Sequence, residues 1–332
     1  MRLVRCLGLK LSNGEVAPAH AAAVPLALCY ARGVASAPYR YQSHDEDSAR
    51  WLSFQFRPGD IVISTRRRTG TTWMQVICGL LIFQRPELPA PLWHLSPWLD
   101  HLVVPADLVH ARLAEQPHRR FIKTHTPLDG IPHDRRVTYI VTVRHPLDAF
   151  VSFRRQIENM DRSRMEQLTG EAIEPETNET LHDRLVRWIE EDADPRADRD
   201  SLPGMMNHFS GAWAKRFEAN VVLVHYDDLR ADLEGQMRAL AWRLGIGVPE
   251  GAWPALTSAA SFQRMRDHSE RLIPATQGII KDTASFFSRG TSGAASEILS
   301  TREMARYHAR AAQLAPPEML EWLHSPSSLR TA

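Results

Sequence analysis

Short runs of consecutive apolar residues alternate along this chain with segments whose apolar residues recur every three to four positions. The short runs are rich in β-branched residues, which favour buried strands, and the three-to-four spacing is typical of helices packed on one face. Strands and helices that alternate in this way are characteristic of α/β proteins. We therefore predict one α/β domain with a central, mainly parallel sheet that carries helices on both faces.

The first strand–helix unit is Asp60–Trp73, in which an apolar strand passes through a basic turn directly into a helix. Pro86 is expected to end that helix. Its buried face is indicated by apolar residues that lie one helical turn apart, namely Trp73, Val76, Ile77, Leu80 and Leu81.

The turn before this helix, Arg66–Gly70, has the chemistry of an anion-binding site. Backbone N–H groups are free at a helix N-terminus, and the helix dipole is positive there. The hydroxyls of Thr69, Thr71 and Thr72 add hydrogen-bond donors. We expect this turn to hold a phosphate, although a capped helix beside a solvated arginine cluster is the alternative.

A second unit, Val137–Ser152, has the same order of strand, turn and helix, and Pro146 is placed to open the helix. Arg144 follows the strand directly, and Ser152 lies two turns into the helix. Open α/β sheets bind ligands at the carboxyl ends of their strands. Arg144 and Ser152 are therefore candidates for a second anion site, with an ordinary surface arginine and a packed serine as the alternative.

Between these units, the short strand in Arg119–Leu128 carries Lys123 and His125 at its end. A neutral imidazole can take a proton from a hydroxyl near neutral pH. Because it follows Lys123 and falls between the two candidate anion sites, His125 is the candidate general base, although a lone histidine is more often a surface or capping residue.

A third unit, Asn220–Leu229, reads as another buried strand, and a helix follows whose apolar face ends before Gly245. An ATP-dependent kinase of the P-loop class would use Asp227 or Asp228 here as a magnesium ligand. The turn Arg66–Gly70 fits that class poorly, because it lacks the first glycine of the motif and has Thr71 in place of the lysine.

In their order along the chain, these segments resemble the soluble, cytosolic-type sulfotransferases that use 3′-phosphoadenosine 5′-phosphosulfate (PAPS). Arg67–Trp73 resembles the family's PKSGTTW loop, with Arg68 in place of the lysine. Arg144 with Ser152 resembles its 3′-phosphate signature, and Lys123–His125 its KTH segment. The resemblance extends over residues 38–323 and implies a P-loop-like fold.

Three later segments extend the resemblance. Tyr226 is implied near the adenine, and Ser261–Met265 resembles an SFxxM adenine contact. Phe286–Gly293 partly resembles an RKG turn, in which Ser288 replaces the first arginine. The co-substrate site that the resemblance implies consists of Arg68, Thr69, Gly70, Thr71, Thr72, Trp73, Arg144, Ser152, Tyr226, Phe262, Met265, Arg289 and Gly290.

The resemblance also implies direct, in-line sulfuryl transfer without a metal. His125 would take the acceptor's proton, Lys123 would contact the sulfuryl oxygens, and Arg68 would stabilise the leaving phosphate. An arginine can stabilise that charge but cannot lend a proton, so a catalytically impaired nucleotide- or lipid-binding relative is a further alternative.

Two segments limit the chemical class of the expected acceptor. Ser96–Asp100 and Arg119–Gly130 resemble the mycobacterial glycolipid sulfotransferases, so the acceptor is expected to be a glycolipid or lipid alcohol, or a phenol. Trp93, Trp98, Leu102 and Val103 are candidates for its binding site, although such residues more often belong to the core. The polar segment Glu190–Asp200 has no periodicity and is expected to be a solvated loop.

Composition sets the remaining expectations. The 332 residues are 43% hydrophobic and 24% charged, enough for one sizeable core, and the net charge of +1 gives no general attraction to nucleic acid. No apolar run approaches the roughly 20 residues that span a bilayer, and the three cysteines form no CxxC pattern. We expect a cytoplasmic enzyme, with a homodimer left open. Residues 1–37 would form a poorly structured N-terminal extension, residues 38–323 the sulfotransferase domain that the resemblance implies, and residues 324–332 a C-terminal tail.

Overall fold

The computed structural model describes residues 37–169, 178–273, 278–287 and 292–325. In these residues the strands are β1 (Ile61–Ser64), β2 (Phe121–Thr124), β3 (Thr138–Val143) and β4 (Val221–His225). The longer helices are α1 (Thr71–Phe83), α3 (Ala106–Glu115), α4 (Pro146–Glu158), α5 (Arg162–Thr169), α6 (Leu181–Glu190), α7 (Leu202–Ala214), α9 (Leu233–Arg243), α14 (Thr301–Leu314) and α15 (Pro317–His324).

Shorter helices connect them. The short α-helices are α2 (Leu92–Leu95), α8 (Tyr226–Ala231), α10 (Trp253–Ala259), α11 (Phe262–Asp267), α12 (Ser269–Leu272) and α13 (Thr283–Phe286). The 3₁₀ helices are η2 (Ser48–Ser53), η3 (Leu128–Gly130), η4 (Glu250–Ala252) and η5 (Ala294–Glu297).

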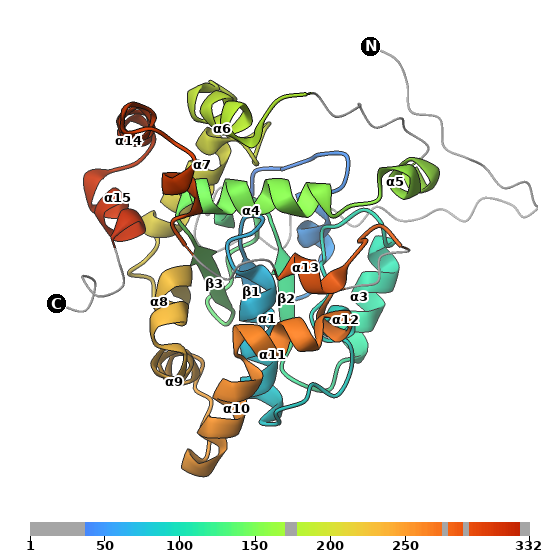
Figure 1. Ribbon diagram of the computed structural model, residues 1–332. Helices are drawn as coiled ribbons and strands as arrows, with labels where there is room; N and C mark the ends of the chain where they lie inside the picture. The colour runs from blue at the N-terminus through green and yellow to red at the C-terminus, as the bar shows by residue number, and fades with distance from the viewer. Residues whose placement is uncertain (1–36, 170–177, 274–277, 288–291, 326–332) are drawn as a thin grey trace, which may run out of the picture. The chain divides into compact units, whose positions relative to one another are not determined.

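The strands form a parallel sheet in the order β2–β1–β3–β4 (Figure 1). In the central register, Ile63 of β1 lies opposite Lys123 on one side and Ile140 on the other. From β1 the chain goes outward to β2 and then returns to add β3 on the opposite side of β1. The strand order therefore reverses between β1 and β3, which is where open α/β sheets bind their ligands.

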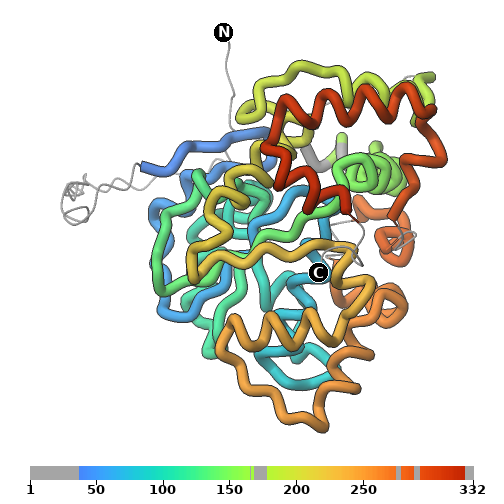
Figure 2. The backbone as a smooth tube through the Cα atoms, turned by 90° about the vertical axis from the view of Figure 1, so that its left-hand side faces the viewer, coloured from blue at the N-terminus to red at the C-terminus, as the bar shows by residue number. Residues whose placement is uncertain are grey.

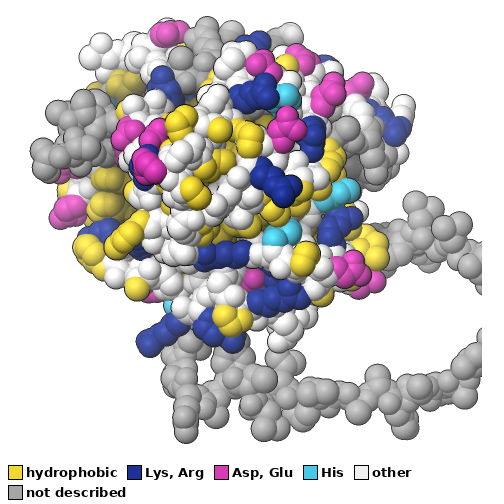
Figure 3. Space-filling view, turned by 90° about the horizontal axis from the view of Figure 1, so that it is seen from below, with side chains coloured by type: hydrophobic (Ala, Val, Ile, Leu, Met, Phe, Trp, Pro, Cys, Tyr) yellow, Lys and Arg dark blue, Asp and Glu magenta, His cyan; other side chains and the backbone are white. Residues whose placement is uncertain are grey.

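Helices cover both faces of the sheet, as predicted (Figures 1 and 2). Alternate residues of β1 point to opposite cores: Val62 belongs to the core that includes residues of α4, α6, α7 and α14, whereas Ile61 and Ile63 belong to the core that includes residues of α1, α9 and α10. The predicted α/β fold class is confirmed. Side chains of both charges occur among hydrophobic ones on the face in Figure 3, in keeping with the near-zero net charge.

The predicted element boundaries agree with the structure except in the third unit. Helix α1 ends before Pro86, and α4 begins at Pro146. The strand expected over Asn220–Leu229 instead ends at His225, whose Nδ1 accepts a hydrogen bond from the backbone N–H of Asp227 and so caps α8. The side-chain cap starts a helix at Tyr226, three residues before the expected end of the strand.

The predicted domain boundaries stay predictions. Residues 1–36 and 326–332, which make up most of the predicted extension and tail, lie outside the described residues. The described residues from Pro38 onward group as one compact unit, and its last described helix, α15, ends at His324. Within the described part of the chain, no helix is both long and apolar enough to cross a membrane.

A buried ion pair ties the amino-terminal ends of β1 and β2. The Arg120 guanidinium donates to both carboxylate oxygens of Asp60, through Nε at 2.8 Å and through Nη2. Both side chains are almost fully buried, and Asp60 also accepts from the backbone N–H of Arg57. Loss of one partner would leave a charge without compensation in the protein interior.

We predict that Asp60→Ala lowers the free energy of unfolding by about 3–5 kcal/mol, because Arg120 then stays buried without its partner. Urea denaturation would measure this. Asp60→Ala with Arg120→Met should recover much of the loss, and Arg136→Ala, which removes an exposed pair, should change the midpoint little. Equal midpoints for Asp60→Ala and Arg136→Ala would contradict the prediction.

Candidate active site

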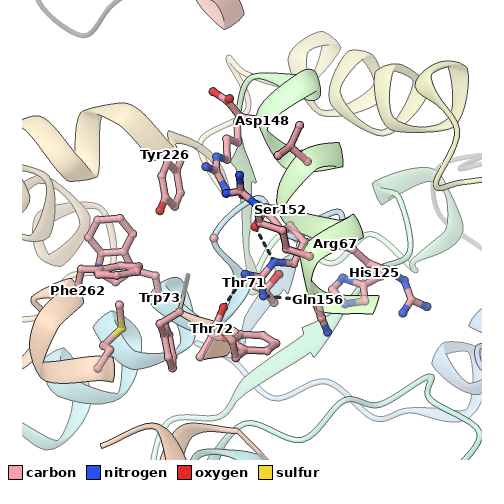
Figure 4. A pocket seen from close by; sticks show the side chains of 18 of the residues that line it. Arg67, Thr71, Thr72, Trp73, His125, Asp148, Ser152, Gln156, Tyr226 and Phe262 are labelled. Carbon is pink, nitrogen blue, oxygen red and sulfur yellow. Dashed lines mark hydrogen bonds between the residues drawn. The ribbon is translucent and has the colours of Figure 1, made fainter. Parts of the chain in front are cut away.

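A cleft opens at the carboxyl ends of β1 and β3, and its empty space, including the mouth, is about 990 Å³ (Figure 4). Most of the predicted site residues line it together. They are Arg68, Gly70, Thr71, Thr72, Trp73, Lys123, His125, Arg144, Ser152, Tyr226, Phe262 and Met265. Arg289 and Gly290 lie outside the described residues.

Gly70 joins the turn to α1 with a φ of +111°, which a residue with a side chain rarely adopts. No side chain caps the N-terminus of α1, so its first backbone N–H groups are available to a ligand. The hydroxyls differ from the expectation. Thr69 is fully buried and donates to the Arg66 carbonyl at 2.8 Å, and the Thr71 hydroxyl bonds that of Thr65 at 2.6 Å. Thr69 therefore holds the turn rather than facing the cleft.

The Arg68 guanidinium links the turn to α4 and α13. It donates to Ser152 Oγ at 3.0 Å, to Gln156 Oε1 at 3.3 Å and to the Phe286 carbonyl at 2.6 Å. It also lies 4.3 Å from the centre of the Phe286 ring. The two predicted anion-binding segments are therefore in direct contact.

Arg144 completes this junction. Its Nη1 donates to the Arg68 carbonyl at 3.3 Å, and its guanidinium lies 4.3 Å from the centre of the Tyr226 ring. Burial, together with the positive charge of Arg144, lowers the pKa of Arg68 to about 10. Cations crowded in this way repel one another, and a bound anion would relieve the repulsion.

His125 is held in the tautomer that a general base requires. Its Nδ1 lies 2.6 Å from the Thr65 carbonyl, which can only accept, so Nδ1 carries the proton and Nε2 has a free lone pair. Burial, followed by the charges of Lys123 and Arg67, lowers the pKa of His125 well below 6.5. The imidazole is therefore neutral at physiological pH.

Lys123 lies beside His125 in the cleft, and its ammonium is 3.9 Å from the centre of the Trp98 ring. His101 stacks on Trp98 with ring centres 4.0 Å apart. Burial and the nearby charge of Arg67 lower the pKa of Lys123 to about 8. Lys123 is therefore mostly protonated at neutral pH and can stabilise negative charge.

The opposite end of the cleft is aromatic. The Trp73 indole donates to the Ala260 carbonyl at 2.8 Å and meets Tyr226 edge to face, with ring centres 5.4 Å apart. Phe262 and Met265 from α11 line the same end. These fixed apolar side chains could hold a flat heteroaromatic ring.

Sequence reasoning missed three polar residues of α4 that line the cleft, namely Asp148, Arg155 and Gln156. Helical spacing was the available signal, because Asp148 precedes Ser152 by four residues and Gln156 follows it by four. Asp148 also accepts a hydrogen bond from the Gly293 backbone N–H at 2.8 Å. Assigning the residues of α4 to the faces of the helix would have predicted that all three lie near Ser152 at the cleft.

The alternative of a solvated arginine cluster at the turn is not supported, because Arg66 is only 1% exposed. The segment Glu190–Asp200 is not simply a solvated loop either, since Arg199 is buried against Glu46 and Asp200 forms an ion pair with Arg66. Ion pairs with residues that are distant in the sequence hold the end of this polar segment against the rest of the protein.

Asp227, the residue that a magnesium-dependent kinase would use, is engaged elsewhere. Its carboxylate accepts from the Ser292 hydroxyl and lies 3.6 Å from Arg230 Nη1. It is not one of the residues that line the cleft. This arrangement gives the kinase interpretation no support.

Comparison with known proteins agrees with this geometry. The sulfotransferase domain model matches residues 58–315, and the chain belongs to that family. The chain is 37% identical over 311 residues to a glycolipid sulfotransferase of Mycobacterium bovis (strain BCG / Pasteur 1173P2), covering 86% of this chain and 93% of that protein. The glycolipid sulfotransferase Rv1373 of Mycobacterium tuberculosis is 38% identical over 310 residues, with the same coverage.

Solved structures support the fold. Mouse sulfotransferase SULT7A1 complexed with PAP has a TM-score of 0.64 at 16% identity, and the match covers 85% of this chain and 92% of that one. Retinol dehydratase in a complex with retinol and PAP has a TM-score of 0.63 at 19% identity, covering 80% and 84%.

We predict that Gly70→Ala lowers the free energy of unfolding by about 1–3 kcal/mol, because the new Cβ forces a strained backbone and meets Tyr226 at 3.3 Å. Gly211→Ala is the matched control: it lies within α7 with no atom within 4 Å of its new Cβ, and it should be neutral or stabilising. Urea denaturation compares the two. A loss at Gly70 no larger than that at Gly211 would contradict the prediction.

Proposed function

We propose that this chain transfers a sulfuryl group from PAPS to a hydroxyl of an apolar acceptor, namely a glycolipid or lipid alcohol, or a phenol. One observation carries the proposal. The turn Arg66–Gly70, called the phosphate turn below, contacts the second anion-binding segment through the hydrogen bond from Arg68 to Ser152. Both residues line the same cleft as the neutral His125. PAPS carries a 5′-phosphosulfate and a 3′-phosphate on the ribose of one adenosine, and these two anionic groups match this pair of segments.

The cleft offers side chains suited to each part of PAPS, which supports the proposal. The free N–H groups of α1 and the Arg68 guanidinium would hold the 5′-phosphosulfate. Arg144 and Ser152 would hold the 3′-phosphate. The adenine would lie at the aromatic end, against Trp73, Tyr226 and Phe262, with Met265 beside it.

The transfer itself would need few groups. The acceptor oxygen forms a bond to sulfur as the bond from sulfur to the phosphate oxygen breaks. The acceptor's proton passes to His125 Nε2, and the electron pair of the broken bond stays on the phosphate, which Arg68 stabilises. Lys123 would bind the sulfuryl oxygens. These side chains supply a base for the proton and positive charge for the leaving phosphate, so the proposed step does not call on a metal ion.

The acceptor class rests on the relatives and on one wall of the cleft. The two relatives at 37% and 38% identity are glycolipid sulfotransferases. Trp98 lies beside Lys123 and His125, which are the residues nearest to the reacting hydroxyl in this mechanism. An apolar alcohol is therefore the acceptor that we propose. A cytoplasmic location and a homodimer remain predictions.

A binding-only relative is the second candidate, because Arg68 replaces the lysine of the family loop and three groups already accept its hydrogen bonds. Labelled sulfate transfer from PAPS over a panel of glycolipids, lipid alcohols and phenols separates the two functions. Thermal stabilisation by 3′-phosphoadenosine 5′-phosphate (PAP), the product left when PAPS loses its sulfuryl group, would argue against a kinase if it occurs without metal and if ATP with Mg²⁺ gives none. Stabilisation by PAP without transfer to any acceptor would favour the binding-only function.

We predict that His125→Ala lowers kcat by about 10²–10⁴-fold, because the base at the acceptor hydroxyl is lost. The affinity for PAP should change little, since His125 binds neither phosphate in this scheme. Steady-state transfer and calorimetry measure the two quantities, with His94→Ala as a surface control. A loss in kcat below about tenfold would rule out His125 as the base.

We predict that kcat/KM for PAPS falls as the pH rises through about 8, because Lys123 of the enzyme without bound substrate loses its proton, and with it its charge, in this range. No acid limb should appear between pH 6 and 8, because His125 is already neutral there. Lys123→Arg keeps the positive charge and should remove the alkaline limb. An unchanged limb in Lys123→Arg would show that another group causes it.

A further inference from the structure

The loop that follows β1 holds His125 from two directions. The Thr65 carbonyl accepts from the His125 ring at 2.6 Å, and the Arg66 guanidinium donates to the His125 backbone carbonyl at 2.6 Å. Arg66 is almost fully buried. The position of the imidazole therefore depends on the position of Thr65 and Arg66.

Asp200, from the loop before α7, fixes this arrangement in turn. One carboxylate oxygen accepts from Arg66 Nη2 at 2.5 Å, and the other lies 3.2 Å from Arg67 Nε. Burial raises the pKa of Asp200, but the charges of Arg66 and Arg67 outweigh it and hold the pKa below its ordinary value. Asp200 is therefore ionised at neutral pH and bridges two consecutive arginines of the phosphate turn.

Two other carboxylates support the same turn. Arg67 Nη2 lies 2.5 Å from Asp45 and 3.2 Å from Glu46, and Glu46 also pairs with Arg199 at 2.8 Å. Arg199 directly precedes Asp200 in the chain. The loop before α7 and the segment before η2 thus both anchor the turn, through charges that are partly or fully buried.

We propose that Asp200 is a positioning residue for sulfuryl transfer. By binding Arg66 and Arg67 together, it places the imidazole of His125 and the phosphate turn at a fixed separation. The inference rests on the proposed function and goes beyond it, because Asp200 is not one of the residues lining the cleft and acts through the two arginines. Its loss should affect the geometry of the transfer step more than the binding of the nucleotide.

Asp200→Asn is the test variant, since it keeps the shape of the side chain but removes its charge. We expect kcat to fall about 10–100-fold, the scale that a displacement of about 1 Å costs in catalysis, while the Kd for PAP changes less than about threefold. Asp200→Glu should restore kcat to within about fivefold of the wild type. Glu191→Gln removes an exposed carboxylate of the same loop and should behave like the wild type.

An NMR measurement tests the same point without turnover. In ¹⁵N-histidine-labelled protein, the Nδ1–H signal of His125, assigned by its absence in His125→Ala, should shift or exchange faster in Asp200→Asn. Should that variant fail to fold, Arg66→Lys replaces it, because lysine cannot bridge the His125 carbonyl and Asp200 as a guanidinium does. It should show the same NMR change and the same loss of kcat.

Three results would overturn the proposal: an unchanged His125 signal, a kcat within threefold of the wild type, or a loss of PAP affinity as large as the loss of kcat. A wild-type protein that transfers sulfate to no acceptor would instead refute the proposed function, and the NMR comparison would still decide the role of Asp200.

Discussion

The parallel pairing of β1 with β3 is the constraint on which the rest of this structure depends. Because the strand order reverses between them, the two loops that leave their carboxyl ends open into one cleft. One loop ends in the uncapped N-terminus of α1, and the other delivers Arg144 and the helix that carries Ser152. Strand β2, on the other side of β1, brings Lys123 and His125 to the same edge.

Burial and like charge give these groups their chemical character. Arg68 lies beside Arg144, and Lys123 is near Arg67, so the lowered pKa values of Arg68 and Lys123 reflect the cost of gathering cations away from water. The same field keeps His125 neutral and able to accept a proton. Carboxylates compensate the neighbouring Arg66 and Arg67, but Asp45 and Asp200 are not among the residues that line the cleft. Among the described residues, five cationic side chains line it against one carboxylate, that of Asp148, so the charge facing the ligand stays positive.

Local sequence patterns were sufficient where one strand–turn–helix unit determines a residue's position. Arg68, Arg144 and Ser152 could be placed at the cleft from such units, and Gln156 could have been found from its helical spacing. The contacts of Asp45 and Asp200 with the turn could not, because both acids come from loops without periodicity, and Asp200 is far from the turn in sequence. The inward hydroxyl of Thr69 was also beyond prediction, since its rotamer depends on the path of the turn.

The most direct test of this account is a crystal structure of the protein with PAP bound. We expect the 5′-phosphate to lie on the N–H groups of Thr71 and Thr72, and the 3′-phosphate to contact Arg144 and Ser152. His125 should face the open end of the cleft beside the 5′-phosphate. A nucleotide whose two phosphates lie away from these segments, or on opposite sides of the sheet from His125, would contradict it.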